Sequence, residues 1–375
     1  MTGVVFTCFL AAWIVQVIYW LGVHLRGVFS PLDRGPSGTD LSESSPAAPP
    51  VSVIVCARNE AENLQKNLPL ILNQVYRSFE LIVVNDHSTD KTLDVLKHMR
   101  ESRHTFRIVN FTNMKFSPGK KDVLAAGIAA ATNEWLLLTD ADCAPASVHW
   151  IRDMLKPATR SGTGVILGYS PYRPLHGVLG AVIGYETLLT AVQYFGWARC
   201  GHPYMGVGRN LAYRKSLYRA AGGFAAHREL ASGDDDLLIG RIARAENTQV
   251  VLDDGARTVS PPPHTWPDWV RQKRRHLSTG TRYAPLTQVL LGGFGASHLA
   301  VYTLGAALLL TGYAPWAGGL LTARMLLLAV LFAVLRKRLP DSPPVWQLLL
   351  ADGCWPLYYL FFTPFLFLHN RITWK

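Results

Sequence analysis

Residues 134–142 read EWLLLTDAD, an apolar run that ends in two aspartates separated by a single residue. A continuous apolar run without alternation is typical of a strand buried on both faces of a parallel sheet. Ligands of such sheets bind beyond the carboxyl ends of the strands, which is where Asp140 and Asp142 would lie. Their oxygens suit a hard divalent cation that also holds a diphosphate. Taken alone, an Asp-x-Asp (DXD) pair fits a helix cap or a solvated turn equally well.

Three further short apolar runs precede this stretch and alternate with helical patterns. The runs cover residues 51–57, 79–86 and 106–111, and the helical patterns extend to about residue 74, from about residue 89, and over residues 119–131. This alternation predicts an α/β fold of the nucleotide-binding type, with a mostly parallel sheet covered on both faces. The polar residues at 58–60 and 85–90 would then share one edge of the sheet with the two aspartates.

A second acidic group, Asp234-Asp235-Asp236, follows Gly233 and precedes the apolar residues LLI. Three adjacent carboxylates repel one another, so the pKa of at least one is expected to rise, and that residue could accept a proton near neutrality. The alternative is a helix N-terminus, whose dipole favours acids. That explanation accounts for one aspartate better than for three.

A basic group occupies residues 269–276, which read WVRQKRRH. On a helix, Arg271, Gln272 and Arg275 would lie on one face, where they could hold phosphate oxygens. Lys273 and Arg274 are better explained as contacts to lipid headgroups, the usual role of a basic run beside a membrane.

The composition points to a membrane protein. Of the 375 residues, 49% are hydrophobic and 17% are charged, whereas about 25% are charged in an average soluble domain. Residues 4–23 carry no formal charge and are long enough to cross a bilayer. Further candidate spans are residues 286–314, 316–335 and 345–368. The domains expected are an N-terminal transmembrane helix (1–26), a flexible linker (27–50), a catalytic domain (51–283) and a C-terminal transmembrane region of two or three spans (284–375).

The charge distribution limits the partners and the orientation. A net charge of +11 fits an anionic membrane or a phosphorylated substrate, and no nucleic-acid-binding motif accompanies it, so nucleic acid is not an expected partner. Basic residues cluster at 271–275 and 336–338 but not near Pro315, so the positive-inside rule predicts a cytoplasmic catalytic domain. The five cysteines are scattered and form no CxxC pair, which argues against a zinc site or a disulfide framework.

Charged residues also occur inside apolar stretches. Arg324 and Asp352 fall within candidate spans and could line a path for the acceptor, although Arg324 could equally well extend to the membrane surface. Residues 178–198 carry only Glu186 as a formal charge, which predicts either a helix lying against the membrane or an ordinary buried helix.

Seven motifs follow one another along the chain: VSVIVCARNE, ELIVVNDHSTD, PGKK, TDAD, GVGRNLAYRKS, SGDDDLL and QKRRH. In this order and spacing they resemble the membrane-bound family 2 glycosyltransferases, the group with the GT-A nucleotide-sugar-binding fold that includes cellulose, hyaluronan and ceramide glucosyl synthases. The resemblance covers residues 51–283. It implies an inverting hexosyltransferase that uses a UDP-sugar donor and a divalent cation, either Mg²⁺ or Mn²⁺.

The resemblance also implies roles for individual residues in donor binding. The residues that would hold the nucleotide and its diphosphate are Ala57, Glu60, Asp86 and Lys120. Asp140 would contact the nucleotide sugar or the metal, and Asp142 would bind the cation.

The remaining implied roles concern catalysis. Asp235, or its neighbour Asp234, would be the general base that removes the acceptor proton. Gln272 and Arg275 would close over the diphosphate and supply positive charge as the leaving group develops negative charge. Residues 206–210 would form part of the acceptor wall. The family's usual Gln-x-x-Arg-Trp ends here in His276, a smaller stacking platform, which weakens the case for chain elongation.

The function expected is transfer of a sugar from a UDP-sugar to a lipid or lipid-linked acceptor at the cytoplasmic face of the cell membrane. The partners expected are the nucleotide-sugar donor, a lipid or glycan acceptor and membrane lipids. One alternative is a processive polysaccharide synthase, which would extrude its product. Another is a membrane protein that binds nucleotide sugars without catalysis, a role for which Asp235 would not be needed.

Overall fold

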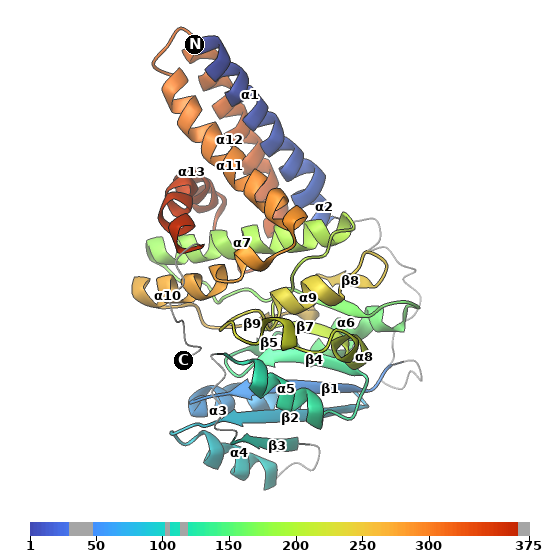
Figure 1. Ribbon diagram of the computed structural model, residues 1–375. Helices are drawn as coiled ribbons and strands as arrows, with labels where there is room; N and C mark the ends of the chain where they lie inside the picture. The colour runs from blue at the N-terminus through green and yellow to red at the C-terminus, as the bar shows by residue number, and fades with distance from the viewer. Residues whose placement is uncertain (30–47, 102–105, 113–118, 367–375) are drawn as a thin grey trace. The chain divides into compact units, whose positions relative to one another are not determined.

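The computed structural model describes residues 1–29, 48–101, 106–112 and 119–366 (Figure 1). Their contacts divide the chain into two compact units. Among the described residues, the helical unit contains residues 1–29, 174–200 and 262–366, and the sheet unit contains residues 48–101, 106–112, 119–173 and 201–261. Residues 174–200 and 262–283, placed in the catalytic domain by the sequence-based boundaries, therefore group with the helical unit. Most of the expected linker lies outside the described residues.

The sheet unit alternates strands and helices. Its strands are β1 (Val51–Ala57), β2 (Phe79–Asp86), β3 (Phe106–Phe111), β4 (Trp135–Asp140), β5 (Ala144–Pro145), β6 (Val165–Gly168), β7 (Leu211–Arg214), β8 (Thr248–Val251) and β9 (Thr258–Val259). Its α-helices are α3 (Ala61–Leu72), α4 (Thr92–Glu101), α5 (Lys121–Ala130), α6 (Trp150–Leu155), α8 (Lys215–Ala220) and α9 (Asp236–Ile242). Short 3₁₀ turns are η3 (Lys156–Thr159), η4 (Ala225–His227) and η5 (Asp254–Ala256).

Seven strands form one sheet in the order β3-β2-β1-β4-β7-β6-β8. The β1, β2, β3 and β4 pairings are parallel, β7 is antiparallel to both of its neighbours, and β6 and β8 are parallel. The predicted mostly parallel α/β sheet is confirmed. A separate antiparallel pair joins β5, which follows β4 in the chain, to β9.

Helices cover both faces of the sheet because successive strand side chains point to opposite sides. Val53 and Val55 of β1 belong to a core that also contains Leu64 and Leu68 of α3. On the other side, Gly127 of α5 approaches Ile54 and Val84 so closely that a Cβ atom would lie 2.7 Å from Ile54 Cγ2. The apolar runs of the sequence thus form a sheet that is covered by helices on both faces.

The helical unit is built from long apolar helices. Its elements are α1 (Thr2–Ile18), the π-helical turn η1 (Tyr19–His24), α2 (Leu25–Val28), α7 (Gly177–Arg199), α10 (Trp266–Leu277), η6 (Gly280–Arg282), α11 (Pro285–Leu308), α12 (Ala314–Arg336), α13 (Val345–Phe362) and η7 (Thr363–Leu366). Four stretches among the described residues are long and apolar enough to cross a membrane: Thr2–Val28, α7, α11 and α12. The third predicted C-terminal span forms α13, which is not among these four and contains Pro356.

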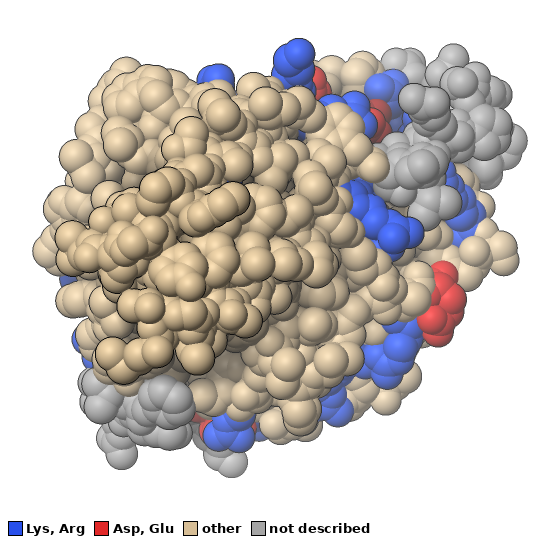
Figure 2. Space-filling view, turned by 90° about the horizontal axis from the view of Figure 1, so that it is seen from above, with Lys and Arg blue, Asp and Glu red and all other residues tan. Residues whose placement is uncertain are grey.

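The surface of these helices is apolar. Leu310, Trp316, Leu326, Val330 and Leu350 are all exposed. Viewed from above, the molecule shows a broad area with neither basic nor acidic side chains, and charged groups appear only toward its margin (Figure 2). Such a surface suits a lipid environment.

Small residues allow close packing within the helical unit. Gly27 of α2 and Gly196 of α7 meet so closely that a Cβ atom on Gly27 would lie 2.5 Å from the backbone nitrogen of Gly196. Close backbone approach at glycines is typical of helix pairs in membranes. A second contact region joins Phe9 of α1 to Val301 of α11 and Ala317 of α12.

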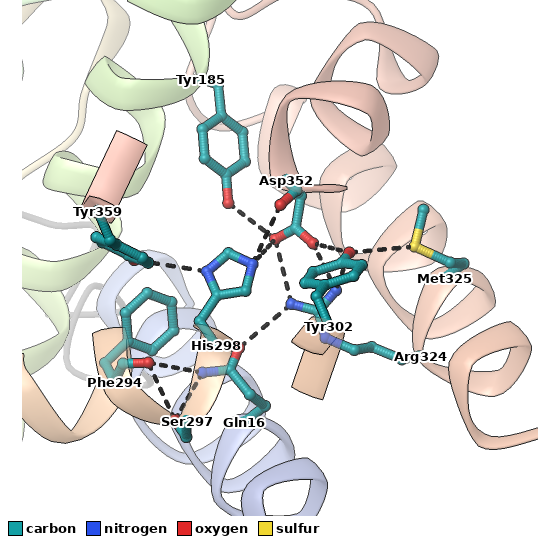
Figure 3. A network of polar contacts seen from close by, with 10 residues as sticks. All are labelled: Gln16, Tyr185, Phe294, Ser297, His298, Tyr302, Arg324, Met325, Asp352 and Tyr359. Carbon is teal, nitrogen blue, oxygen red and sulfur yellow. Dashed lines mark hydrogen bonds and ion pairs between the residues drawn. The ribbon is translucent and has the colours of Figure 1, made fainter. Parts of the chain in front are cut away.

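The two charges found inside apolar segments pair with each other. Asp352 of α13 is fully buried and accepts two hydrogen bonds from the Arg324 guanidinium of α12 (Figure 3). Its carboxylate also accepts hydrogen bonds from the hydroxyls of Tyr185 (2.8 Å) and Tyr302 (2.7 Å), and His298 Nε2 lies 3.4 Å away. The network therefore joins α7, α11, α12 and α13. A path for the acceptor along these two residues stays a prediction.

Candidate active site

The parallel register brings the ends of three strands to one level. Cα partners across the sheet are Ala57 with Asn85 and Cys56 with Asp140. Asp86, the last residue of β2, and Asp140, the last residue of β4, therefore end on the same edge as β1. The polar residues predicted to converge on this edge do so.

One end of the edge is organised around Asp86, which is 5% exposed. His87 Nδ1 lies 2.9 Å from its Oδ1, and Arg58 Nη1 lies 3.8 Å from its Oδ2. The loops after β1 and β2 are tied together, since Asn59 N–H donates to Ser88 Oγ and Glu60 N–H donates to Thr92 Oγ1. Ala57 and Glu60 thus lie beside a buried carboxylate on a cross-linked pair of loops.

The other end offers cation ligands. Carboxylate oxygens of Asp140 and Asp142 and the sulfur of Cys143 lie within 4.8 Å of one another. Burial, and then the neighbouring Asp140 carboxylate, raises the pKa of Asp142 above its ordinary value. Repulsion from Asp140 adds to the larger effect of burial, and a divalent cation between the two carboxylates would relieve that repulsion. The donor set therefore fits a hard divalent ion.

Lys120 stands beside these acids. Its ammonium group is buried and forms an ion pair with Asp140 Oδ1. Burial would lower the pKa of Lys120, but the Asp140 carboxylate outweighs it and the pKa lies well above its ordinary value. Lys120 therefore keeps its positive charge at physiological pH, as a contact to a diphosphate requires.

Asp235 is a carboxyl group with strongly perturbed acidity. Burial raises its pKa to about 7, helped by the adjacent carboxylates of Asp234 and Asp236. Its Oδ2 accepts the Gly208 N–H at 2.8 Å and its Oδ1 accepts the Asp236 N–H at 2.8 Å, which fixes its orientation at the start of α9. A carboxyl group of this acidity is suited to accept a proton near neutrality.

Two family models match the chain. The model described as glycosyl transferase family 2 matches residues 52–211, and the model described as glycosyl transferase family group 2 matches residues 135–367, which is more than half of the chain. The chain is a family 2 glycosyltransferase. The predicted family and GT-A fold are thereby confirmed.

Known relatives of this glycosyltransferase are distant. The probable glycosyltransferase YdaM of Bacillus subtilis is 26% identical over 65% of this chain and 58% of the relative. The poly-beta-1,6-N-acetyl-D-glucosamine synthase of Staphylococcus epidermidis is 26% identical over 38% of this chain and 34% of the relative. The matches thus span little more than half, or about a third, of the relatives' own length.

A solved structure shares the fold over nearly the whole chain. The mannosyltransferase PcManGT from Pyrobaculum calidifontis, in complex with GDP-Man and Mn²⁺, superposes with a TM-score of 0.60 at 20% identity, and the match covers 95% of this chain and 99% of that one. At this level of identity the likeness concerns the fold alone.

The structure adds Arg209 to the residues singled out in the sequence. Its guanidinium stacks 4.1 Å from the Tyr172 ring centroid and donates to Ser260 Oγ. It also interacts electrostatically with Asp142, while the preceding residue, Gly208, donates to Asp235. The Gly208–Arg209 backbone therefore links the two acidic clusters. The only signal in the sequence was an arginine inside the motif GVGRN, interpreted as acceptor wall.

Gln272 and Arg275 lie on α10, in the helical unit, so their predicted approach to the diphosphate stays a prediction. Lys273 corrects the sequence analysis. It was expected to contact lipid headgroups, but its side chain is buried and its Nζ lies 2.7 Å from Glu186 Oε1 of α7. The partner is far away in sequence, so a basic run alone could not reveal the pair.

Proposed function

We propose that this glycosyltransferase moves a sugar from a nucleotide-diphosphate sugar onto a hydroxyl group of a lipid or lipid-linked acceptor, with inversion at the anomeric carbon. The observation that supports the proposal is that the sheet unit holds two carboxylates placed to suit a cation, Asp140 and Asp142, and a third, Asp235, whose pKa is raised to about 7. Residues 208 and 209 connect the two groups, because the Gly208 N–H donates to Asp235 and Arg209 interacts electrostatically with Asp142.

For the donor, Asp86 is proposed to accept hydrogen bonds from the base, with Ala57 and Glu60 lining the pocket. Both uracil and guanine present ring N–H groups to such a carboxylate. A UDP-sugar is the first donor to test, as the resemblance implies. A GDP-sugar is the second, because the similarly folded PcManGT was solved with GDP-Man.

For the diphosphate, Lys120 supplies a permanent positive charge and Asp140 and Asp142 would hold Mg²⁺ or Mn²⁺. The cation, when bound, neutralises the charge that develops on the departing diphosphate. Gln272 and Arg275 of α10 are proposed to add hydrogen bonds and charge to the same group.

For the transfer, the ionised Asp235 carboxylate takes the proton of the acceptor hydroxyl as that oxygen forms its bond to the anomeric carbon. The bond between that carbon and the diphosphate oxygen breaks, and its electron pair leaves with the nucleoside diphosphate. Attack opposite the leaving group inverts the configuration. The Gly208 and Asp236 N–H groups hold the carboxylate in one orientation, which keeps Asp235 from turning away from the acceptor.

The membrane is proposed as the source of the acceptor. Four helices are long and apolar enough to cross it. Exposed basic residues occur at the C-terminal end of α12 (Arg336, Lys337 and Arg338) and just before α11 (Arg282). Under the positive-inside rule these ends face the cytoplasm. The catalytic domain is therefore proposed to be cytoplasmic.

The test uses the purified full-length protein in detergent with UDP-glucose, UDP-N-acetylglucosamine or GDP-mannose, Mg²⁺ or Mn²⁺, and a bacterial lipid extract. Release of the nucleoside diphosphate should require both cation and lipid, and EDTA should abolish it. Asp142→Ala should lower the rate by about 100-fold or more. Glu62→Gln, on the exposed surface of α3, is the control and should leave it unchanged. Undiminished release by Asp142→Ala would remove the metal assignment.

Processive polysaccharide synthesis is the second candidate, favoured by the similarity to poly-beta-1,6-N-acetyl-D-glucosamine synthase. Product size separates the two. A single sugar on an extracted lipid supports the first proposal, whereas a polymer that grows with time in size-exclusion chromatography supports the second.

A further inference from the structure

One carboxylate fastens α10 to α7. Glu186 Oε1 lies 2.7 Å from Lys273 Nζ, and Glu186 Oε2 accepts the indole N–H of Trp269 at 3.1 Å. Trp269 and Lys273 are one helical turn apart, and both are buried. Two contacts from one turn of α10 to a single side chain fix both the rotation of the helix and its position along α7.

Two further contacts join α10 to aromatic rings of the helical unit, one from the Trp269–Lys273 face and one from a neighbouring face. The Trp269 ring meets Phe362 edge-on at 5.3 Å between centroids, and the Arg274 guanidinium lies 5.0 Å from the centre of the Phe365 ring. Ring–ring and cation–π contacts attract the helix but constrain its rotation less than hydrogen bonds to a fixed carboxylate do. The directional contacts come from Glu186.

Because α-helices have about 3.6 residues per turn, the face that holds Trp269 and Lys273 leaves Arg275 turned away from α7. Gln272 lies between the two directions. The contacts of α10 with Glu186, which we call its seat, therefore determine the directions in which the Gln272 and Arg275 side chains point. A small rotation of the helix would displace the Arg275 guanidinium by several ångströms, since that side chain is long.

We propose that Glu186 is a positioning residue for the transfer reaction: it sets the rotation of α10 and thereby aims Gln272 and Arg275 at the leaving diphosphate. This inference rests on the role proposed above for α10. In this proposal Lys273 binds Glu186 and so holds α10 in place. The proposal also explains why an acidic residue lies in the middle of the largely apolar helix α7.

The experiment combines kinetics with a measurement of how α10 is seated. Glu186→Gln keeps the size of the side chain and an acceptor for Trp269 but removes the negative charge. We expect kcat for nucleoside diphosphate release, with the active donor from the panel above and bacterial lipid extract, to fall by about tenfold or more, with a smaller change in the donor KM. In the absence of substrate, trypsin should cleave faster at Arg271 to Arg275 of the detergent-solubilised variant.

Two comparisons make the result decisive. Because Glu186 is proposed to act through Arg275, the Glu186→Gln/Arg275→Ala double variant should be no slower than Arg275→Ala alone. The matched control is the exposed pair Glu62–Lys66 of α3, where Glu62→Gln should alter neither readout.

The outcomes separate the two proposals. Faster cleavage with normal kcat, or additive losses in the double variant, would overturn the positioning role. If neither the cleavage rate nor kcat changes, then Glu186 does not fix the rotation of α10 either. If Arg275→Ala itself turns over normally while Glu186→Gln still loosens α10, the proposed role of α10 in catalysis has failed, although the seat exists. If folding limits Glu186→Gln, the Glu186→Lys/Lys273→Glu exchange should restore slow cleavage.

Discussion

Two groups of acids in this chain, one fully buried and one half-buried, differ in how their charge is balanced. In the helical unit, the Asp352 carboxylate is bound by the Arg324 guanidinium and by two tyrosine hydroxyls. In the sheet unit, Asp142 and Asp235 lie next to other carboxylates, and neither forms a salt bridge with a Lys or Arg of the described chain.

The difference separates charges that hold structure from charges that are available for chemistry. A carboxylate whose oxygens are saturated by fixed donors has no capacity left for a substrate or a metal. Carboxylates that repel one another store a preference for a proton or a cation. Removing a charge should therefore cost stability in the first group and activity in the second.

The largest effect is expected from Asp235→Asn. The amide cannot take a proton from the acceptor, so kcat should fall by about 10²- to 10⁴-fold. Relief of repulsion from Asp234 and Asp236 offsets the altered hydrogen bonds, so the free energy of unfolding should change by no more than about 1 kcal/mol. Steady-state kinetics and thermal unfolding of the same preparation give both numbers. Asp254→Asn, an exposed acid of the sheet unit, is the control. A large loss of stability alongside the loss of activity would contradict the proposed difference between the two groups of acids.

Arg324→Met should show the opposite pattern. It leaves the fully buried Asp352 carboxylate without its cation, which is expected to destabilise the helical unit by about 3–5 kcal/mol. The double variant Arg324→Met/Asp352→Leu removes both charges and should recover most of that loss. Unfolding in mixed detergent micelles measures the difference. A double variant that is stable but inactive would show that this group serves the reaction, contrary to the comparison drawn here.

Because the pKa of Asp235 is raised to about 7, both the reaction rate and the stability of the sheet unit should depend on pH near neutrality. With a pKa of about 7, the base is ionised above neutrality, so kcat/KM should rise about tenfold per pH unit below pH 7 and level off above it. The folded-state pKa lies above the value of about 3.9 for an unfolded aspartate. The folded protein therefore binds more protons between these values, and this residue's contribution to stability falls as pH rises from about 4 to about 7. Asp235→Asn should remove both dependences, and a flat wild-type profile would contradict the assignment.

The sequence predicted the parts of the sheet that depend on continuous apolar runs. The strands at 51–57, 79–86 and 106–111 have the predicted bounds, because β-branched runs flanked by polar residues leave little choice of register. The short strand β7 was not foreseen. It pairs antiparallel between β4 and β6 from within a segment interpreted as acceptor wall. Four residues carry too weak a pattern to indicate their partners.

The site divides in the same way. The Asp140–Asp142 pair and the acidic run at 234–236 are local signals, and parallel topology places strand ends together without further information. Pairings between distant residues were beyond reach. Lys273 with Glu186 and Arg324 with Asp352 each join two helices, and the sequence shows only that each charge stands in an apolar or basic context.

The smallest effect is expected from Tyr302→Phe, which measures how much one hydroxyl contributes to the stability of the Asp352 network. Tyr302→Phe removes one of the hydrogen bonds to Asp352 Oδ2 and the acceptor for Arg324 Nη1. Because the guanidinium still neutralises the carboxylate, we expect a loss of only about 1 kcal/mol in the same micellar unfolding measurement, with normal kcat. Tyr313→Phe is the matched control, since that hydroxyl makes no hydrogen bond within the described part of the chain. A loss as large as that of Arg324→Met would mean that the hydroxyl, and not the ion pair, dominates the group, whereas a slower reaction without loss of stability would move Tyr302 into the class of chemically active residues.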